Sequence, residues 1–388
     1  MYFYAIKCIL YLQTRAKQII VSETRFGTEG EVNMKKMFLI SLTILLVGIL
    51  FISCGKKQSD EVQTPAATTQ TTASAAKAPE AQATVPLIGV SKIITHDALD
   101  SVEQGIQDHL ASKNVQVRYD WQNANGDPST ANSIAQKFKA DKVSLAVGIG
   151  TPVAVALANT FADIPVIFTA ITDPLDANLV PSYTTPYDAN TAGVSDMNPV
   201  DAQIKLLVEL TGAKTVGNVY ASGEANGVLL MEEAKAACAE LGVEFVTAAV
   251  ANTSEVMQAL QAIIGRVDAV YIATDNTVIS ALPSIADVAA KASVPLMSAD
   301  PSGVEKLDFL VAWGFNYYKI GLATGRVIEE ILVNNKKPGE IGTIFLTEPT
   351  DFELWFNLDV AKKLGITISD ELLAEAAVII EGGKKIVK

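Results

Sequence analysis

The stretch VSLAVGIGTPVAVALANTFADIPVIFTAITDP, at residues 143–174, decides the fold class of this chain. Two short apolar runs, 143–150 and 165–171, flank a segment at 152–161 that has the composition of a helix. Short apolar runs joined by a helix are typical of parallel strands with crossover connections. The stretch therefore predicts an α/β protein built on a parallel sheet.

The same alternation of short strands and helices continues in both directions. Further strands are predicted at 86–94 and 115–122, with helices at 98–113 and 129–140. A second series begins with TAGVSD (191–196) and has helices near 199–211, 224–242, 254–265 and 277–292, separated by strands TVGNVYAS, EFVTAAV and AVYIATD. The tail adds strands PLMSAD, FLVAWGF, TIFLTE and ELWFNLD, a helix at 317–335 and a short VAKKLG helix. Two series of one kind predict two doubly wound, Rossmann-like lobes, with a ligand cleft between them at the carboxyl ends of the strands.

Charge and composition argue against several classes of protein. The net charge is −13, whereas binding to nucleic acid requires a positive field. Gly148 and Gly150 are followed by Val153, where a dinucleotide-binding fingerprint requires a third glycine. The chain has 2 histidines, His96 in a loop and His109 on a polar helical face, and no cluster of metal ligands is evident. We therefore expect no cofactor, no metal, no nucleic-acid partner and no enzymatic activity.

The N-terminal region has the pattern of a targeting signal followed by a tether. Residues 34–53, MKKMFLISLTILLVGILFIS, run from two lysines through about 16 mostly apolar residues to Cys54. This order resembles a bacterial lipoprotein signal peptide in which Cys54 becomes the lipidated first residue; an uncut signal anchor is the alternative. Residues 1–33 precede the signal and its own Met, and we interpret them as an upstream extension. Residues 54–85 are predicted to be a disordered, lipid-anchored tether.

Polar side chains directly follow the predicted strands, where an open α/β sheet presents its loops. Most are hydroxyls, amides and carboxylates: Ser91, His96, Thr151, Thr169, Thr172, Asp173, Asn226, Thr274, Asp275, Asn276 and Asp300. This chemistry suits a zwitterion, because Asp275 or Asp300 could bind an ammonium group. The start of the helix at Thr151 could bind a carboxylate. Phe168, Tyr220 and Tyr271 are candidates for apolar walls.

Several of these residues also have a purely structural explanation. Asp275 and Asn276 could cap the helix that follows them. Asp173 and Asp300 precede prolines and could form turns. His96 could be a loop residue without a ligand. The residues alone leave these alternatives open.

The chain also resembles a known family. The stretches GVSKIITHDALD, YDWQNANGDPSTANSIAQKF, TPVAVALAN, PVIFTAITDP, TAGVSDMNPV, ASGEANG, YIATDNTVISAL, PLMSAD and GFNYYKIGLATG resemble the type I solute-binding proteins of ABC importers. Among these, the chain is similar to the lipoproteins that bind tryptophan or related aromatic amino acids. The resemblance implies a type I periplasmic binding protein fold, in which two lobes crossed by three hinge strands close on a ligand. It implies a first lobe of residues 86–195 plus about 314–342, and a second lobe of 196–313 plus about 343–388.

The function that the resemblance implies is capture of a small amino acid and its delivery to an ABC permease. The expected ligand is aromatic: tryptophan, tyrosine or phenylalanine. The expected protein is a monomer, attached to the extracytoplasmic side of the cell membrane through Cys54. By similarity the pocket candidates are Thr151, Thr169, Asp173, Asn226, Thr274, Asp275, Asn276 and Asp300, and the position after strands adds Ser91, His96 and Thr172. A sugar or nucleoside ligand, a structural or sensory lipoprotein, and an enzyme using Asp275 or Asp300 as a base remain alternatives.

Overall fold

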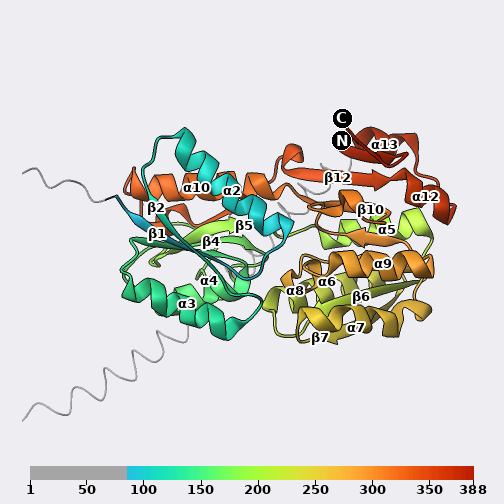
Figure 1. The fold of residues 1–388 in the computed structure, drawn as a ribbon, viewed down its shortest axis with the longest axis horizontal. Coiled ribbons are helices and arrows are strands. Elements are labelled where there is room, and N and C mark those ends of the chain that lie inside the picture. Colours follow the sequence, from blue (N-terminus) through green and yellow to red (C-terminus); the bar gives the residue numbers. More distant parts are fainter. Residues whose placement is uncertain (1–84) are drawn as a thin grey trace, which may run out of the picture. The chain divides into compact units, whose positions relative to one another are not determined.

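Two separate β-sheets, each flanked by helices, make up the part of the chain that the computed structural model describes, residues 85–388 (Figure 1). The predicted signal peptide, the lipidation site at Cys54 and the tether lie outside the described residues. No helix within residues 85–388 is long and apolar enough to cross a membrane.

The first sheet contains six parallel strands in the order β11-β5-β4-β3-β1-β2. The strands are β1 (Leu87–Lys92), β2 (Arg118–Asn123), β3 (Leu145–Ile149), β4 (Val166–Ile171), β5 (Thr191–Ser195) and β11 (Thr343–Phe345). Its helices are α2 (Asp97–Ser112), α3 (Pro128–Ala140), α4 (Thr151–Thr160), α10 (Tyr317–Leu332) and the short α11 (Pro338–Ile341). Helix α2 packs against α10, and α3 against α4. Strands β3, β4 and β5 are buried at every position, which explains why they read as continuous apolar runs.

The second sheet contains eight strands in the order β14-β13-β12-β10-β9-β8-β6-β7. The strands are β6 (Thr215–Ala221), β7 (Glu244–Val250), β8 (Ala269–Ile272), β9 (Leu296–Ser298), β10 (Val311–Phe315), β12 (Phe352–Asn357), β13 (Val378–Glu381) and β14 (Lys384–Val387). Its helices are α5 (Val200–Thr211), α6 (Ala225–Glu240), α7 (Val256–Ile263), α8 (Asn276–Ile279), α9 (Leu282–Ala292), α12 (Leu358–Leu364) and α13 (Asp370–Glu375). Strand β12 runs antiparallel to β10, whereas β6 to β10 are parallel.

Both sheets share one strand order. In the first sheet β1 lies between β2 and β3, and in the second β6 lies between β7 and β8. Each sheet therefore has a point where the direction of winding reverses, beside β1 and beside β6 respectively, and such points are where doubly wound sheets bind ligands. The prediction of two doubly wound lobes is confirmed.

The chain passes between the two sheets three times. The crossings lie between β5 and α5, between β10 and α10, and between β11 and β12. Strand β10 ends in the second sheet at Phe315, and β11 joins the first sheet through Phe345. The second and third crossings therefore fall one to three residues later than the predicted boundaries near 314 and 343.

Two secondary-structure predictions were wrong. The helix predicted at 277–292 is two helices, α8 and α9, because Pro283 occupies the first turn of α9 and cannot continue α8. No helix or strand was predicted after α12, yet α13 and the antiparallel hairpin β13–β14 follow. Gly382 and Gly383, both with positive φ, form the turn of that hairpin.

Helices α2 and α10 approach so closely that glycine is required at the contact. A Cβ at Gly105 would lie 2.3 Å from the Tyr318 carbonyl oxygen, and one at Gly321 would lie 2.3 Å from the Val102 carbonyl oxygen. Further along, His109 is buried, with Nε2 2.7 Å from Glu329 Oε2 of α10. The prediction that His109 lies on a polar face was therefore wrong. This contact fastens α10, which follows the second crossing, to the first lobe.

We expect Gly105→Ala to lower the free energy of unfolding by about 1–3 kcal/mol, because the added methyl overpacks the α2–α10 contact. Gly265→Ala is the matched control, since a Cβ there meets no atom within 4 Å. Urea-induced unfolding of both variants measures the difference. Equal stability of the two variants would contradict the close approach.

Candidate ligand-binding site

A small cavity lies between the two lobes at the carboxyl ends of both sheets. It is lined by His96, Leu99, Ala170, Thr172, Asp196, Asn226, Thr274, Asn276, Ile279, Asp300 and Tyr317. Each residue lies at the carboxyl end of a strand, in the loop after it, or in the first turn of the helix that follows. Both points of reversed winding contribute, through His96 after β1 and Asn226 in the first turn of α6. Near Ala170, whose φ is 53°, the register of β4 against β5 shifts. The cavity thus lies where the topology predicts a ligand.

Two buried carboxylates belong to this cavity. Asp196 lies in the first crossing, and its Oδ2 accepts a hydrogen bond of 2.7 Å from the Tyr317 hydroxyl. Its Oδ1 has no hydrogen-bond partner among residues 85–388. Asp300 follows β9, and its Oδ1 accepts a hydrogen bond of 2.8 Å from the Ser302 amide.

Burial controls the charge of both carboxylates. It raises the pKa of Asp196 to about 6 and that of Asp300 to about 7. The residues that line the cavity include no Lys or Arg. A cationic ligand group would therefore supply the positive charge that these carboxylates lack.

Amide and hydroxyl groups of the second lobe are held in place by a hydrogen-bond network. Asn276 Nδ2 donates to Glu224 Oε2 at 2.7 Å, and Glu224 Oε1 also accepts from the Thr277 hydroxyl at 2.6 Å. Asn226 Nδ2 donates to the Thr274 carbonyl at 3.4 Å, while Asn226 Oδ1 is buried without a partner in the described part of the chain. The network orients Asn226 and Asn276, two predicted pocket residues, within the cavity lining.

Asp275 lies outside the cavity lining, and its carboxylate serves the backbone. Oδ2 accepts a hydrogen bond of 2.6 Å from the Ala221 amide, and Oδ1 caps α8 by accepting one of 3.1 Å from Val278. Burial, followed by the nearby charge of Glu224, raises the pKa of Asp275 to about 7. The helix cap, one of the two alternatives for Asp275, is therefore present in the structure.

Four further candidates are also absent from the lining. Thr169 accepts a hydrogen bond of 2.7 Å from the Thr324 hydroxyl of α10. Asp173 forms a turn, because its Oδ1 accepts from the Leu175 amide at 3.0 Å and from the Tyr183 hydroxyl. Thr151 begins α4 and Ser91 lies inside β1, both buried. The proposed walls Phe168, Tyr220 and Tyr271 do not line the cavity either.

Of the predicted residues, the cavity brings together His96, Thr172, Asn226, Thr274, Asn276 and Asp300. Asp196 and Tyr317 were missed. Asp196 directly follows β5, and Tyr317 lies two residues after the end of β10. Asp300 was predicted because it lies shortly after a strand, and the same criterion could have identified Asp196 and Tyr317.

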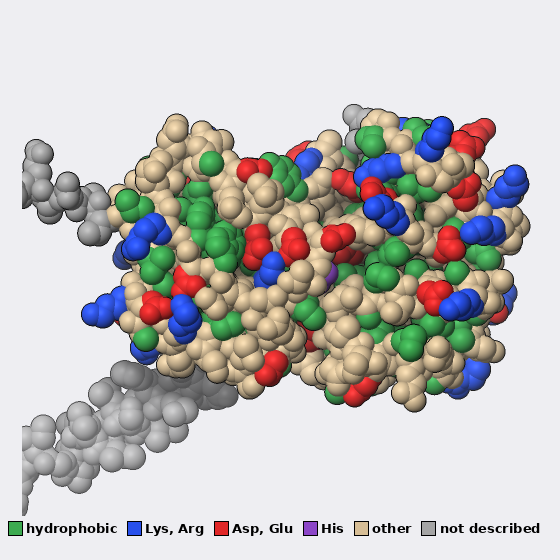
Figure 2. All heavy atoms as spheres, viewed as in Figure 1, with side chains coloured by type: hydrophobic (Ala, Val, Ile, Leu, Met, Phe, Trp, Pro, Cys, Tyr) green, Lys and Arg blue, Asp and Glu red, His purple; other side chains and the backbone are tan. Residues whose placement is uncertain are grey.

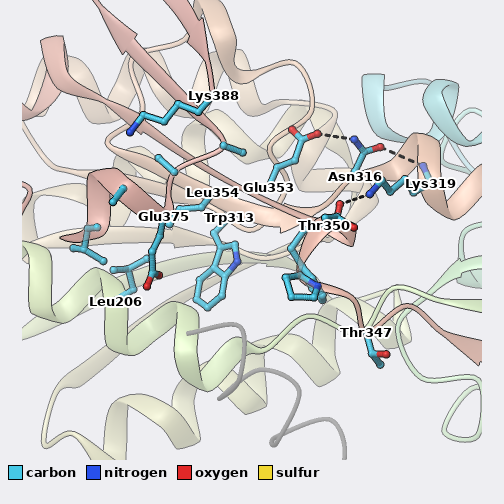
Figure 3. A pocket seen from close by; sticks show the side chains of 16 residues that line it. Leu206, Trp313, Asn316, Lys319, Thr347, Thr350, Glu353, Leu354, Glu375 and Lys388 are labelled. Carbon is cyan, nitrogen blue, oxygen red and sulfur yellow. Dashed lines mark hydrogen bonds between the residues drawn. The ribbon is translucent and has the colours of Figure 1, made fainter. Parts of the chain in front are cut away.

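A second, larger cavity lies beside the second and third crossings (Figure 3). Asn316 Nδ2 donates to Glu353 Oε1 at 2.6 Å, and Lys319 Nζ donates to the Thr350 carbonyl. No predicted site residue lines it. On the molecular face in Figure 2, the described Lys and Arg side chains are interspersed with Asp and Glu and form no broad basic patch.

Two doubly wound lobes, crossed three times and enclosing a polar cavity, define a protein that binds a small ligand between lobes. The chain belongs to the ABC transporter substrate binding protein family, whose family model matches residues 87–380.

Individual relatives support this assignment. A tyrosine-binding protein of Clostridioides difficile strain R20291 is 33% identical over 282 residues, covering 71% of this chain and 80% of that protein. A Streptococcus pneumonia ABC domain in complex with L-Trp is 34% identical, with a TM-score of 0.72, covering 76% of this chain and all of that one. The ligand-free, open structure of a substrate-binding protein with adhesive properties from Clostridium difficile is 31% identical, with a TM-score of 0.56, covering 74% and 97%.

We expect Asp300→Asn to stabilise the ligand-free protein relative to the unsubstituted protein increasingly as pH rises from about 4 to about 7. Because its pKa is raised, the Asp300 carboxyl of the folded protein stays protonated up to a higher pH than in the unfolded chain. The contribution of this carboxyl to stability is therefore lost as pH rises through that window. The change is on the order of a few kcal/mol, since one pKa unit corresponds to about 1.4 kcal/mol. Unfolding at pH 4.5 and 7.5 measures it, and the opposing titration of His96 cancels because both proteins contain it. A stability difference independent of pH would contradict the raised pKa.

Proposed function

We propose that this protein captures a small amino acid with an aromatic side chain and delivers it to an ABC permease. The observation that carries the proposal is the pair of buried carboxylates, Asp196 and Asp300, in a cavity whose lining has no Lys or Arg. An α-ammonium group satisfies that charge, and the unpartnered Oδ1 of Asp196 is available to accept its hydrogen bond.

The rest of the cavity lining suits the remainder of an amino acid. Hydroxyl and amide side chains of Thr172, Thr274 and Asn276 can contact a carboxylate, and Leu99 and Ile279 supply apolar surface from opposite lobes. The names of the relatives, a tyrosine-binding protein and an L-Trp complex, favour an aromatic amino acid. Contacts with both lobes would stabilise the closed arrangement, which a permease can distinguish from the open one.

A thermal-shift panel with amino acids, sugars and nucleosides tests the ligand class. At about 100 times its dissociation constant, an aromatic amino acid should stabilise the protein by about 2.7 kcal/mol. Asp300→Asn should lose most of that shift, because an ammonium group then meets a neutral amide. Asp287→Asn, at an exposed position of α9, should keep it. A shift with sugars or nucleosides alone would overturn the ligand assignment, and no shift would favour a structural or sensory lipoprotein.

We also propose that the mature protein is held on the extracytoplasmic side of the membrane by a lipid on Cys54. Substrate-binding proteins of ABC transporters are extracytoplasmic. The signal-like segment 34–53 before Cys54 and the polar tether after it support a lipid anchor, because the apolar run is short for a spanning helix.

Cys54→Ala should abolish incorporation of radiolabelled fatty acid in a bacterial host and should move the protein out of the detergent phase on Triton X-114 partition. Cys238→Ala is the matched control, since Cys238 is a buried core residue. Labelling that persists in Cys54→Ala would disprove the anchor.

A further inference from the structure

We propose that His96 selects for aromatic amino acids with a polar edge, a phenol or an indole, over a plain phenyl ring. The inference rests on the proposed function, because it assigns the ligand's side chain to a particular part of the same cavity. It begins with an imidazole whose two nitrogens are buried and make no hydrogen bond of standard geometry among residues 85–388, with the Asn276 amide as a neighbour that interacts with one of them.

The imidazole of His96 is not used by the fold. His96 occupies the N-cap position of α2, with φ −158° and ψ 165°, yet its side chain makes no capping hydrogen bond. Other polar groups in the lining do have protein partners: Asn276 bonds to Glu224, and Asp300 to the Ser302 amide. The ring therefore lines the cavity with at least one nitrogen available to a ligand.

The chemistry of that ring suits a phenol or an indole. Burial lowers the pKa of His96 to about 4, so the imidazole is neutral at physiological pH. A neutral imidazole has one donor and one acceptor nitrogen. A phenol hydroxyl can pair with either nitrogen and an indole N–H with the acceptor, whereas a phenyl ring can pair with neither. Leu99 and Ile279 add apolar surface for the ring itself.

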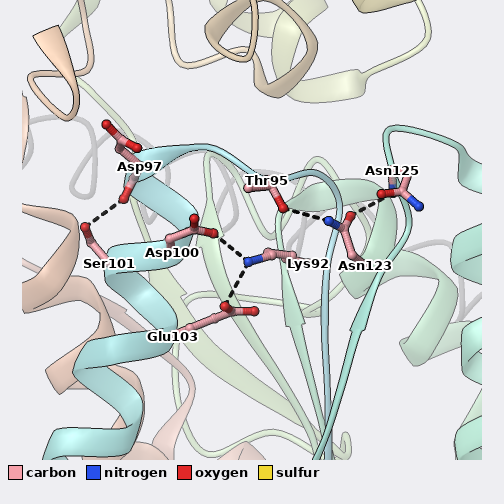
Figure 4. Close-up of polar contacts among 8 residues, drawn as sticks. All are labelled: Lys92, Thr95, Asp97, Asp100, Ser101, Glu103, Asn123 and Asn125. Atoms are coloured by element: carbon pink, nitrogen blue, oxygen red, sulfur yellow. Dashed lines mark hydrogen bonds and ion pairs between the residues drawn. The ribbon is translucent and has the colours of Figure 1, made fainter.

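The loop that carries His96 is fixed on both sides, so the ring cannot easily relocate to find another partner. Lys92 Nζ, at the end of β1, bonds to Asp100 Oδ1 at 2.5 Å and to Glu103 Oε2 at 2.9 Å, both on α2 (Figure 4). Next to His96, the Thr95 hydroxyl accepts a hydrogen bond of 2.8 Å from Asn123 Nδ2 of β2. These contacts span the loop from strand to helix and preorganise His96 in the cavity.

A site that hydrogen-bonds a polar group on its ligand rejects the analogue that lacks it, because the site's own buried groups are then left unpaired. Tyrosine and phenylalanine differ by one hydroxyl, and this pair therefore isolates the role of His96. Tryptophan provides a second polar-edged ligand of different shape.

Isothermal titration calorimetry at pH 7.5 with tyrosine, tryptophan and phenylalanine tests the proposal. The unsubstituted protein should bind tyrosine or tryptophan at least about ten-fold more tightly than phenylalanine. His96→Phe should remove most of that preference by weakening the polar-edged ligand while leaving phenylalanine within about three-fold. His96→Gln, which restores an amide donor and acceptor, should recover part of it.

Other outcomes would overturn the inference. The unsubstituted protein could bind all three ligands with equal affinity, or His96→Phe could lower the affinity for all three equally. Either result would mean that His96 does not discriminate between ligand side chains. If no amino acid binds the unsubstituted protein, the proposed function itself fails. The two failures are distinguishable because amino acids still bind the unsubstituted protein in the first and do not bind it in the second.

Discussion

The buried hydrogen bond from Tyr317 to Asp196 joins two of the three crossings at the edge of the cavity. Asp196 belongs to the first crossing and Tyr317 begins α10 after the second, and 121 residues separate them in sequence. Nearby, Gln203 donates to the Trp313 carbonyl at 2.6 Å and to Asn198 Oδ1 at 3.2 Å. The groups that would contact a ligand and the segments that would bend during closure thus belong to one buried network.

Both lobes contribute residues to the cavity because their sheets share one strand order. Each sheet has a point of reversed winding, and the two points supply His96 and Asn226 to the same cavity. The close, glycine-mediated contact of α2 with α10 makes the first lobe continuous across the second crossing. Neither lobe alone has the full set of lining residues, so complete coordination of a ligand requires both.

Most of the fold could be predicted from sequence because buried parallel strands leave a local pattern. The hairpin β13–β14 was not predicted because its strands are short, although Gly382 and Gly383 indicate a turn between them. The site was only partly predictable. Candidate residues can be identified by their position after a strand, but the direction of a side chain depends on hydrogen-bond partners far away in sequence. Asp275 bonds to the amide of Ala221, 54 residues away, and Thr169 to Thr324, 155 residues away. No local pattern encodes those contacts.

The raised pKa values of Asp196 and Asp300 have a thermodynamic consequence for ligand capture. Near pH 6 to 7 the empty cavity holds these carboxyl groups partly as neutral acids. A bound ammonium ion favours their ionised form, so its arrival expels protons into the surrounding buffer. Capture is then coupled to proton release, and the heat that it releases varies with the buffer that takes up the expelled protons.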